Sequence, residues 1–130
     1  MAYSRSYLKK FKNQIKYGRN TYRNKKNSLP NKFEQSMYNI LNFENIKFER
    51  EYQIPGTYKF FDVFASEFNT LIEFDGDYWH PKTLKEAHTK IQKRNFKNDI
   101  FKNQLAFRHG YKLIRIRQSE NVKSIKKLLQ

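Results

Sequence analysis

The pattern of apolar and polar positions is helical at both ends of residues 30–130. Asn31 and Glu34, which follow Ser28 and Pro30, have the spacing of a capping box, and the next apolar residues share one helix face: Phe33, Met37, Ile40 and Leu41. We predict that this helix ends near Asn42. Residues 119–129 predict a closing helix whose apolar face is formed by Val122, Ile125, Leu128 and Leu129.

The pattern between these helices changes to the alternation that is typical of strands. Three strand candidates cover residues 46–53, 58–65 and 70–74. Turns between them are supplied by Pro55-Gly56 and by Glu67-Phe68-Asn69. The economical topology is therefore a three-stranded meander.

A longer helical pattern and a fourth strand follow the meander. The helix pattern begins at Thr83 and Glu86 and runs, with room for an interruption, to Arg108, where His109-Gly110 is typical of a helix end. Residues 111–117, YKLIRIR, alternate as a strand. A helix between the third and fourth strands forms a crossover, which makes these two strands parallel. We predict an α/β (α+β) fold, a restriction-endonuclease-like mixed sheet of about four strands flanked by helices, in the order α-β-β-β-α-β-α.

Composition limits the class of protein. A chain of 130 residues is long enough for one domain, and 12 Phe and 9 Tyr offset a hydrophobic content of only 38%. The absence of Cys excludes a disulfide framework, a thiolate zinc site and a Cys nucleophile. No segment approaches the roughly 18 apolar residues of a membrane span. We expect a cytoplasmic protein, located in the host cell if a phage encodes it. Frequent Lys, Asn, Phe and Tyr are typical of an AT-rich genome, which suits a phage or a mobile element.

Charge is distributed unevenly along the chain. The net charge is +15, yet residues 31–80 hold four basic and nine acidic side chains, whereas residues 1–30 hold nine basic and no acidic ones and residues 81–130 hold fourteen and three. Such a field attracts a polyanion, and we favour nucleic acid over a lipid surface because the N-terminal part has no clean apolar face. We divide the chain into a basic extension, residues 1–28, and a folded domain, residues 29–130. The extension either stays solvated or folds in part on binding. Its predicted contacts with nucleic acid are Lys9, Lys10, Lys12, Arg19, Arg23, Lys25 and Lys26.

Acidic side chains gather on the second and third predicted strands. Asp62 is the lone acid of an aromatic strand, and Glu73 and Asp75, two residues apart, project from one face about 7 Å apart. Pairing of the two strands brings Asp62 beside Glu73. Crowded carboxylates repel one another unless a cation lies among them, and Mg²⁺ binds such oxygens and keeps waters that can attack a phosphate. We predict a Mg²⁺ site, which Mn²⁺ can also fill, against the alternatives of a solvent-facing Asp62 and a simple turn at Asp75-Gly76-Asp77.

The same residues resemble a family of nucleases. FFDVF at 60–64, IEFDGDYWH at 72–80 and a basic helix leading into HGYKLIRI at 109–116 resemble very-short-patch-repair (Vsr) endonucleases and related phage homing endonucleases of the PD-(D/E)xK superfamily. The resemblance covers roughly residues 30–118. Its most specific element is the Gly-x-x-Trp-His run from Gly76 to His80.

The resemblance implies a Mg²⁺-dependent DNA endonuclease and a role for each matching residue. Asp62 would be the principal metal ligand and the Phe74 backbone carbonyl a second one. Glu34 would reach the metal or its water, although a helix cap is the alternative for this residue. His80 would be the general base, a role suited to a near-neutral pKa. Asp99 would be a further acid, unless it only pairs with a lysine on its own helix.

The chain also departs from the family. The superfamily places a lysine two residues after the Glu, where this chain has Asp75, a position that is histidine in the repair enzymes. The lysine role is therefore missing, taken by His80, or supplied by Lys102. The Cys ligands of the repair enzymes' structural zinc are absent. The choice between the Glu73 side chain and the Phe74 carbonyl, and between nicking and double-strand cleavage, stays open.

Further contacts with nucleic acid are predicted in the second half of the chain, at Tyr78, Trp79, Lys102, Arg115 and Arg117. The two aromatic residues would otherwise pack beneath the site, and the two arginines would otherwise line a solvated sheet face. The expected partner is double-stranded DNA, with a homodimer or a separate specificity domain left open. The rival hypotheses are a non-catalytic DNA-binding module with a nuclease-like fold and an RNA-binding protein whose Tyr and Phe stack on bases.

Overall fold

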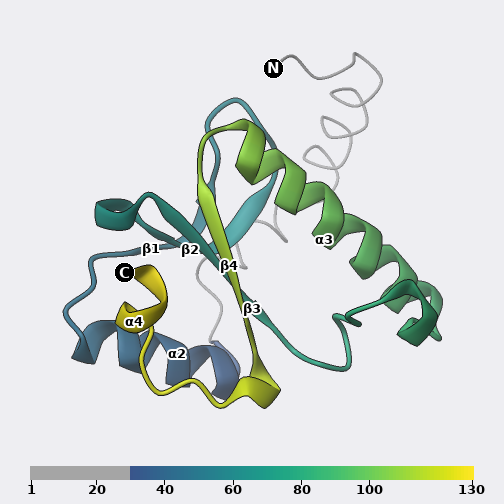
Figure 1. The fold of residues 1–130 in the computed structure, drawn as a ribbon, viewed down its shortest axis with the longest axis horizontal. Helices are drawn as coiled ribbons and strands as arrows, with labels where there is room; N and C mark the ends of the chain where they lie inside the picture. Colours follow the sequence, from purple (N-terminus) through teal and green to yellow (C-terminus); the bar gives the residue numbers. More distant parts are fainter. Residues whose placement is uncertain (1–29) are drawn as a thin grey trace.

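The computed structural model describes residues 30–130 (Figure 1). The predicted basic extension and its seven proposed contacts, Lys9, Lys10, Lys12, Arg19, Arg23, Lys25 and Lys26, lie outside the described residues. The helices are α2 (Lys32–Phe43), α3 (Lys90–Arg108) and α4 (Lys126–Leu129), and the strands are β1 (Glu49–Gln53), β2 (Phe60–Ala65), β3 (Thr70–Asp75) and β4 (Lys112–Arg117). This order confirms the predicted fold class.

The four strands form one mixed sheet in the order β1-β2-β3-β4. β1 pairs antiparallel with β2, and β2 pairs antiparallel with β3, so the meander is confirmed. β3 and β4 are parallel, with a register from Thr70 opposite Lys112 to Asp75 opposite Arg117. The long connection through α3 is therefore the predicted crossover.

Helices cover both faces of the sheet (Figure 1). On one face, α2 and α4 pack on the sheet around Met37, Tyr38, Leu41, Val63, Ala65, Ile72, Phe74, Ile116, Ile125 and Leu129. On the other face, Leu105 and Ala106 of α3 pack on Phe61 and Leu71. Every residue of β3 is buried, because this strand lies between two neighbours and beneath helices on both sides. The acids on β3 are therefore held in the interior.

Two helices begin later than the sequence pattern predicts. Thr83 caps only the short 3-10 helix Leu84–Glu86, and α3 begins at Lys90 because Thr89 and Gln92 form a complete capping box there. The last helix is confined to Lys126–Leu129, since Asn121 adopts a left-handed φ of 50° after the 3-10 helix Gln118–Glu120.

The C-cap of α2 also supports the start of α4. The carboxylate of Glu44 accepts hydrogen bonds from the N–H groups of Ile125 and Lys126, at 2.7 and 3.1 Å, and from the Ser124 hydroxyl at 2.6 Å. Among the helices of residues 30–130, none has the length and apolar character needed to cross a membrane.

Two positions of α2 give a matched test of this packing. Leu41 is fully buried, whereas Phe43 is 88% exposed. We expect Leu41→Ala to lower the free energy of unfolding by about 2–5 kcal/mol, because it leaves a cavity between α2 and the sheet. Phe43→Ala should change it by less than about 0.5 kcal/mol. Urea denaturation followed by circular dichroism measures both, and equal losses in the two variants would contradict the placement of α2.

Candidate functional site

The sheet is distorted at Asp62. The β2–β3 register runs from Ala65 to Val63 and stops there, and the β1–β2 register omits Asp62 and Glu51, whose φ is 49°. Phe61 and Phe64 both pack beneath α3 although they are three residues apart, so the alternation of the strand shifts between them. The ladder between β2 and β3 therefore ends at the predicted metal ligand, and the ladder between β1 and β2 is interrupted there.

Two side chains replace the missing ladder bonds. The Asp62 N–H donates to Oε1 of Glu73 at 3.0 Å, and the Phe74 N–H donates to Oδ2 of Asp62 at 2.7 Å. The predicted proximity of Asp62 and Glu73 is thus confirmed. Because the N–H and C=O of one strand residue point to the same side, the Phe74 carbonyl also faces Asp62.

A cavity of about 610 Å³ lies at this distortion, between α2, the sheet and α3. It collects most of the residues that the sequence singles out: Glu34, Asp62, Glu73, Phe74, Trp79, His80, Asp99 and Lys102. Glu34 also follows its capping role, since its N–H donates to Oδ1 of Asn31 at 2.8 Å. Asp75 does not line this cavity, but lines a neighbouring hollow with Arg115 and Arg117.

Lys102 reaches the cavity from α3. Its ammonium Nζ lies 3.0 Å from Oε1 of Glu73 and 4.5 Å from the ring centroid of Phe61, and the residue is only 8% exposed. A buried ammonium needs such partners, because losing water is costly for a charge. The arrangement places a fixed positive charge, contributed by α3, beside the acids of the sheet.

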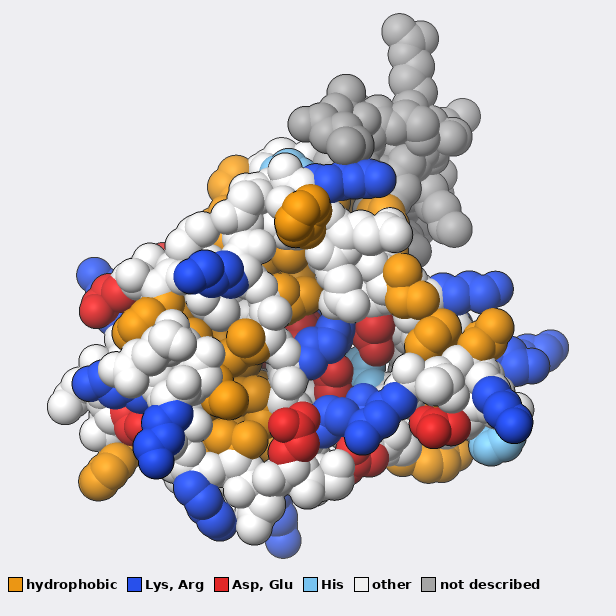
Figure 2. Space-filling view, viewed as in Figure 1, with side chains coloured by type: hydrophobic (Ala, Val, Ile, Leu, Met, Phe, Trp, Pro, Cys, Tyr) orange, Lys and Arg blue, Asp and Glu red, His pale blue; other side chains and the backbone are white. Residues whose placement is uncertain are grey.

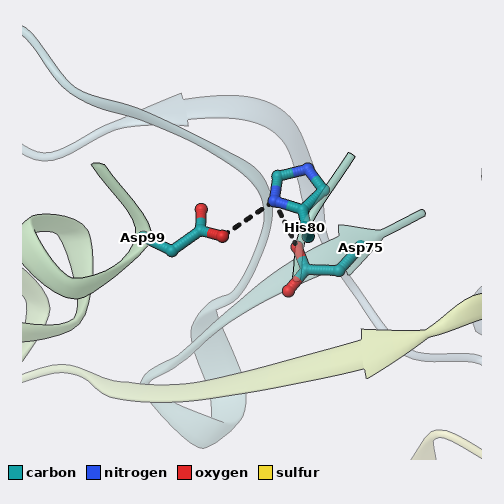
Figure 3. Close-up of side chains that lie close together, drawn as sticks. All are labelled: Asp75, His80 and Asp99. Atoms are coloured by element: carbon teal, nitrogen blue, oxygen red, sulfur yellow. Dashed lines mark hydrogen bonds and ion pairs between the residues drawn. The ribbon is translucent and has the colours of Figure 1, made fainter. Parts of the chain in front are cut away.

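Asp75, His80 and Asp99 form a second cluster next to the cavity (Figure 3). Nδ1 of His80 lies 2.8 Å from Oδ2 of Asp99, on α3, and 3.8 Å from Oδ1 of Asp75, at the end of β3. Within residues 30–130, this is the one group of three metal-binding side chains whose ligand atoms all lie within 4.8 Å.

Arg115 already neutralises the acids of this cluster. Its guanidinium donates to both carboxylate oxygens of Asp75, at 3.1 and 3.2 Å, and lies 3.5 Å from Oδ1 of Asp99. A divalent cation here would lie beside a fixed positive charge and would have to displace it. The cluster is better suited to orienting His80 than to binding a metal.

The cluster also shifts proton affinities. The hydrogen bond with Asp99 is the main cause of a raised pKa of His80, and the charge of Asp75 adds to it, while burial acts in the opposite direction. Burial raises the pKa of Asp75, and the charges of Arg115 and His80 oppose this rise. Since Nδ1 faces Asp99, Nε2 is the nitrogen that can exchange a proton with a substrate or a water.

The loop that carries His80 is held from several sides. Side-chain amides of Gln92 and Asn95, on α3, donate to the Tyr78 and Trp79 carbonyls, both at 2.8 Å. Tyr78 and Trp79 are 61% and 51% exposed, and their rings meet edge to face with centroids 4.8 Å apart. These two rings therefore do not pack beneath the site, and they are available to a partner.

Arg115 and Arg117 contact acids within the chain. Nε of Arg117 donates to Oδ1 of Asp77 at 3.1 Å, and the same guanidinium donates to the His80 carbonyl. Asp77 also accepts from the N–H and the hydroxyl of Ser119. The two arginines thus support the His80 loop, and contact of either one with DNA stays a prediction.

Sequence reasoning did not identify Gln92, Asn95, Asp77 and Ser119 as supports of this loop. Gln92 carried a signal only as the third residue of a capping box with Thr89. The other contacts join residues far apart in the chain, so local sequence patterns do not predict them.

Comparison of the chain with protein-family models, with curated proteins and with solved structures finds no match. The resemblance to Vsr-like nucleases therefore stays an expectation from the motif residues alone.

Asp99→Asn tests the hydrogen bond that orients His80. We expect the pKa of His80 to fall in this variant, because the carboxylate that stabilises the imidazolium is gone. NMR titration of the imidazole resonances measures the shift. Glu86→Gln removes an exposed acid outside the cluster and should leave the titration unchanged. An unaltered His80 pKa in Asp99→Asn would contradict this geometry.

The hydrogen-bonded pair of His80 and Asp99 predicts how the stability of the fold depends on pH. Because the folded-state pKa of His80 is raised, the pair stabilises the fold fully below the ordinary histidine pKa of about 6.5. The contribution should be lost as the pH rises through the raised pKa, and this loss should be absent from Asp99→Asn. Urea denaturation of both proteins across this pH range measures the difference.

Proposed function

We propose that the protein is a Mg²⁺-dependent endonuclease that hydrolyses phosphodiester bonds of double-stranded DNA in the cytoplasm. The observation that carries the proposal is the opening of the sheet at Asp62, where an acidic pair, a buried lysine and a histidine line one cavity. Phosphodiester hydrolysis requires three kinds of group. The acidic pair would supply oxygen ligands for a hard cation, the lysine a fixed positive charge, and the histidine a base.

The donor set fits Mg²⁺ at the Asp62 side of the cavity. Carboxylate oxygens of Asp62 and the Phe74 carbonyl face the same opening, and both are hard oxygen ligands. When bound, Mg²⁺ would polarise the scissile phosphate and supply a water of lowered pKa. Glu73 contributes a further oxygen, although its Oε1 already accepts from Lys102 and from the Asp62 N–H.

Lys102 is the residue that we assign to the lysine role. Its ammonium is fixed by Glu73 and lies on the cavity wall, where it can stabilise the negative charge that develops on the phosphate. His80 is thereby left for the base. Its Nε2 would take the proton of the attacking water while Asp99 holds Nδ1. Glu34 lines the same cavity and can hold the water.

The surface beside the cavity is strongly basic. Exposed lysine and arginine side chains follow the His80 loop and the first half of α3: Lys82, Lys85, Lys90, Lys93, Arg94 and Lys97. They are close in sequence to the exposed rings of Tyr78 and Trp79. Such a surface supports contact with phosphates of the backbone, mostly without reading the base sequence.

Asp62→Asn tests the enzyme hypothesis. We expect the wild-type protein to convert supercoiled plasmid to nicked or linear DNA in Mg²⁺ and to lose this activity in EDTA. Asp62→Asn should lower the rate about a hundredfold or more, because an amide is a poor ligand for Mg²⁺ but can still accept from the Phe74 N–H. Gel analysis of the products also separates nicking from double-strand cleavage.

Glu67→Gln is the matched control, since Glu67 is an exposed acid in the short 3-10 helix Ser66–Phe68 that follows β2. It should cleave as the wild type does. Binding that survives EDTA without any cut product would instead support the non-catalytic DNA-binding module. Stronger competition by single-stranded RNA than by duplex DNA would support the RNA-binding hypothesis.

The salt dependence of DNA binding tests the basic surface. If on the order of 6 to 10 phosphates are contacted, affinity should fall about a thousandfold or more between roughly 50 and 200 mM salt. Lys93→Gln, on α3, should reduce the slope of log affinity against log salt by about 1. Lys127→Gln, on α4 across the sheet, should leave the slope unchanged. Fluorescence anisotropy of a labelled duplex measures each slope, and a flat response would contradict backbone binding.

A further inference from the structure

β4 is an end strand that is paired on one side only within residues 30–130. The Lys112 N–H donates toward β3, to the Asn69 carbonyl at 3.1 Å, whereas the Arg117 N–H donates away from β3, to Oε1 of Glu120 at 3.0 Å. Backbone groups alternate in direction along a strand. The N–H and C=O groups of Leu113 and Arg115 therefore face outward from the sheet.

The two edges of the sheet differ in how they resist pairing. β1 has the sequence EREYQ, and its backbone is distorted at Glu51, which has a left-handed φ. Charged side chains and backbone distortion both hinder the pairing of an edge strand with another chain. β4 is regular over its whole length, and Leu113, Ile114 and Ile116 alternate with its basic residues. An undistorted edge of this kind is competent to pair with another strand.

An apolar stripe of α3 accompanies the open edge. Phe96, Ile100, Asn103 and Phe107 recur at helical spacing, and Ile100 and Phe107 are 42% and 82% exposed. Two hollows of about 540 and 560 Å³ lie between this stripe and β4, and they share Asn103 and Arg115. Figure 2, which views the molecule from the same side as Figure 1, shows hydrophobic side chains gathered on this face among basic and acidic ones.

We propose that a second copy of this chain covers this face, with the two β4 strands antiparallel and centred on Ile114. In that register Leu113 of each copy exchanges both backbone hydrogen bonds with Arg115 of the other. The outward-facing groups of both strands are thereby paired. The two sheets become one continuous sheet, and the stripes of the two α3 helices lie on the same side of it and face one another across the two-fold axis.

Charge favours this register over its neighbours. With Ile114 opposite itself, Lys112 lies opposite Ile116 and Arg117 lies opposite Tyr111, so no basic residue of β4 faces another. A shift by one residue places Lys112 directly opposite Arg117, and like charges directly opposite one another are destabilising. The strand is therefore self-complementary in one register. The net charge of +15 opposes association at a distance, so dimerisation should strengthen as salt is added.

Single cysteines test the register, since the chain has none of its own. Across the proposed axis the Ile114 Cα atoms would lie about 4.5 Å apart, within disulfide range, and about 14 Å would separate the Lys112 Cα atoms. Under mild oxidation of the full chain we expect Ile114→Cys to form a covalent dimer and Lys112→Cys, on the same strand face, to stay uncrosslinked. No crosslink in Ile114→Cys, or equal crosslinking of both variants, would overturn the proposal.

Sedimentation gives a second test that needs no oxidation. At an ionic strength of about 1 M, where the Debye length is about 3 Å, we expect a reversible dimer of the wild-type chain. Phe107→Glu should raise the dimer Kd at least about tenfold, because it buries a charge in the α3 stripe. Phe43→Glu, which alters an equally exposed ring on α2, should not change the Kd. A monomeric wild type, or equal effects of the two variants, would refute the interface, whatever the outcome of the cleavage assay.

Discussion

The two hydrogen bonds that the carboxylates of Asp62 and Glu73 accept from backbone N–H groups across β2 and β3 are the interaction on which the candidate site depends. Each residue offers a carboxylate oxygen to a backbone N–H of the facing strand, and these two bonds stand where ladder bonds would otherwise close the sheet. A buried carboxylate needs hydrogen-bond partners, and an interrupted ladder leaves N–H groups that need acceptors. The carboxylates supply the acceptors that the N–H groups lack, and the N–H groups supply the donors that the carboxylates need. The pair can therefore open the sheet in the protein interior and keep a cavity beside β3.

The two acidic clusters have different partners, which divides their roles. Around Asp75 and Asp99, Arg115 and His80 supply positive charge, so this cluster is nearly neutral and rigid. Asp62 and Glu73 accept from backbone N–H groups of β2 and β3, and Glu73 also contacts the ammonium of Lys102. The Asp75–Asp99 cluster therefore holds an imidazole in place, whereas the Asp62–Glu73 pair presents its oxygens to the cavity.

Local patterns predicted the elements and much of the site. The sequence predicted the proximity of Asp62 and Glu73 because a short turn determines how neighbouring strands pair. It also predicted that β3 and β4 are parallel, because a helical crossover connects them. Helix starts were less predictable, since Thr83 and Thr89 both head capping patterns and only packing decides between them. The partners of Glu73 and Asp75 come from α3 and β4. No spacing within one element encodes such contacts, so Lys102 was one of three options and the Arg115 pairing was missed.

The division of charge between the meander and the segments that follow it has a consequence for folding. The acids Asp62, Glu73, Asp75 and Asp77 belong to β2, β3 and the turn after them, whereas Lys102, Arg115 and Arg117, which pair with three of these acids, arrive with α3 and β4. The parallel β3–β4 pairing must close a long loop, which is the slow step in topologies of this kind. Before that closure, an acidic hairpin and a cationic helix-strand unit attract each other through space. The uneven charge along the chain therefore favours the encounter of these two units, an attraction that salt would screen.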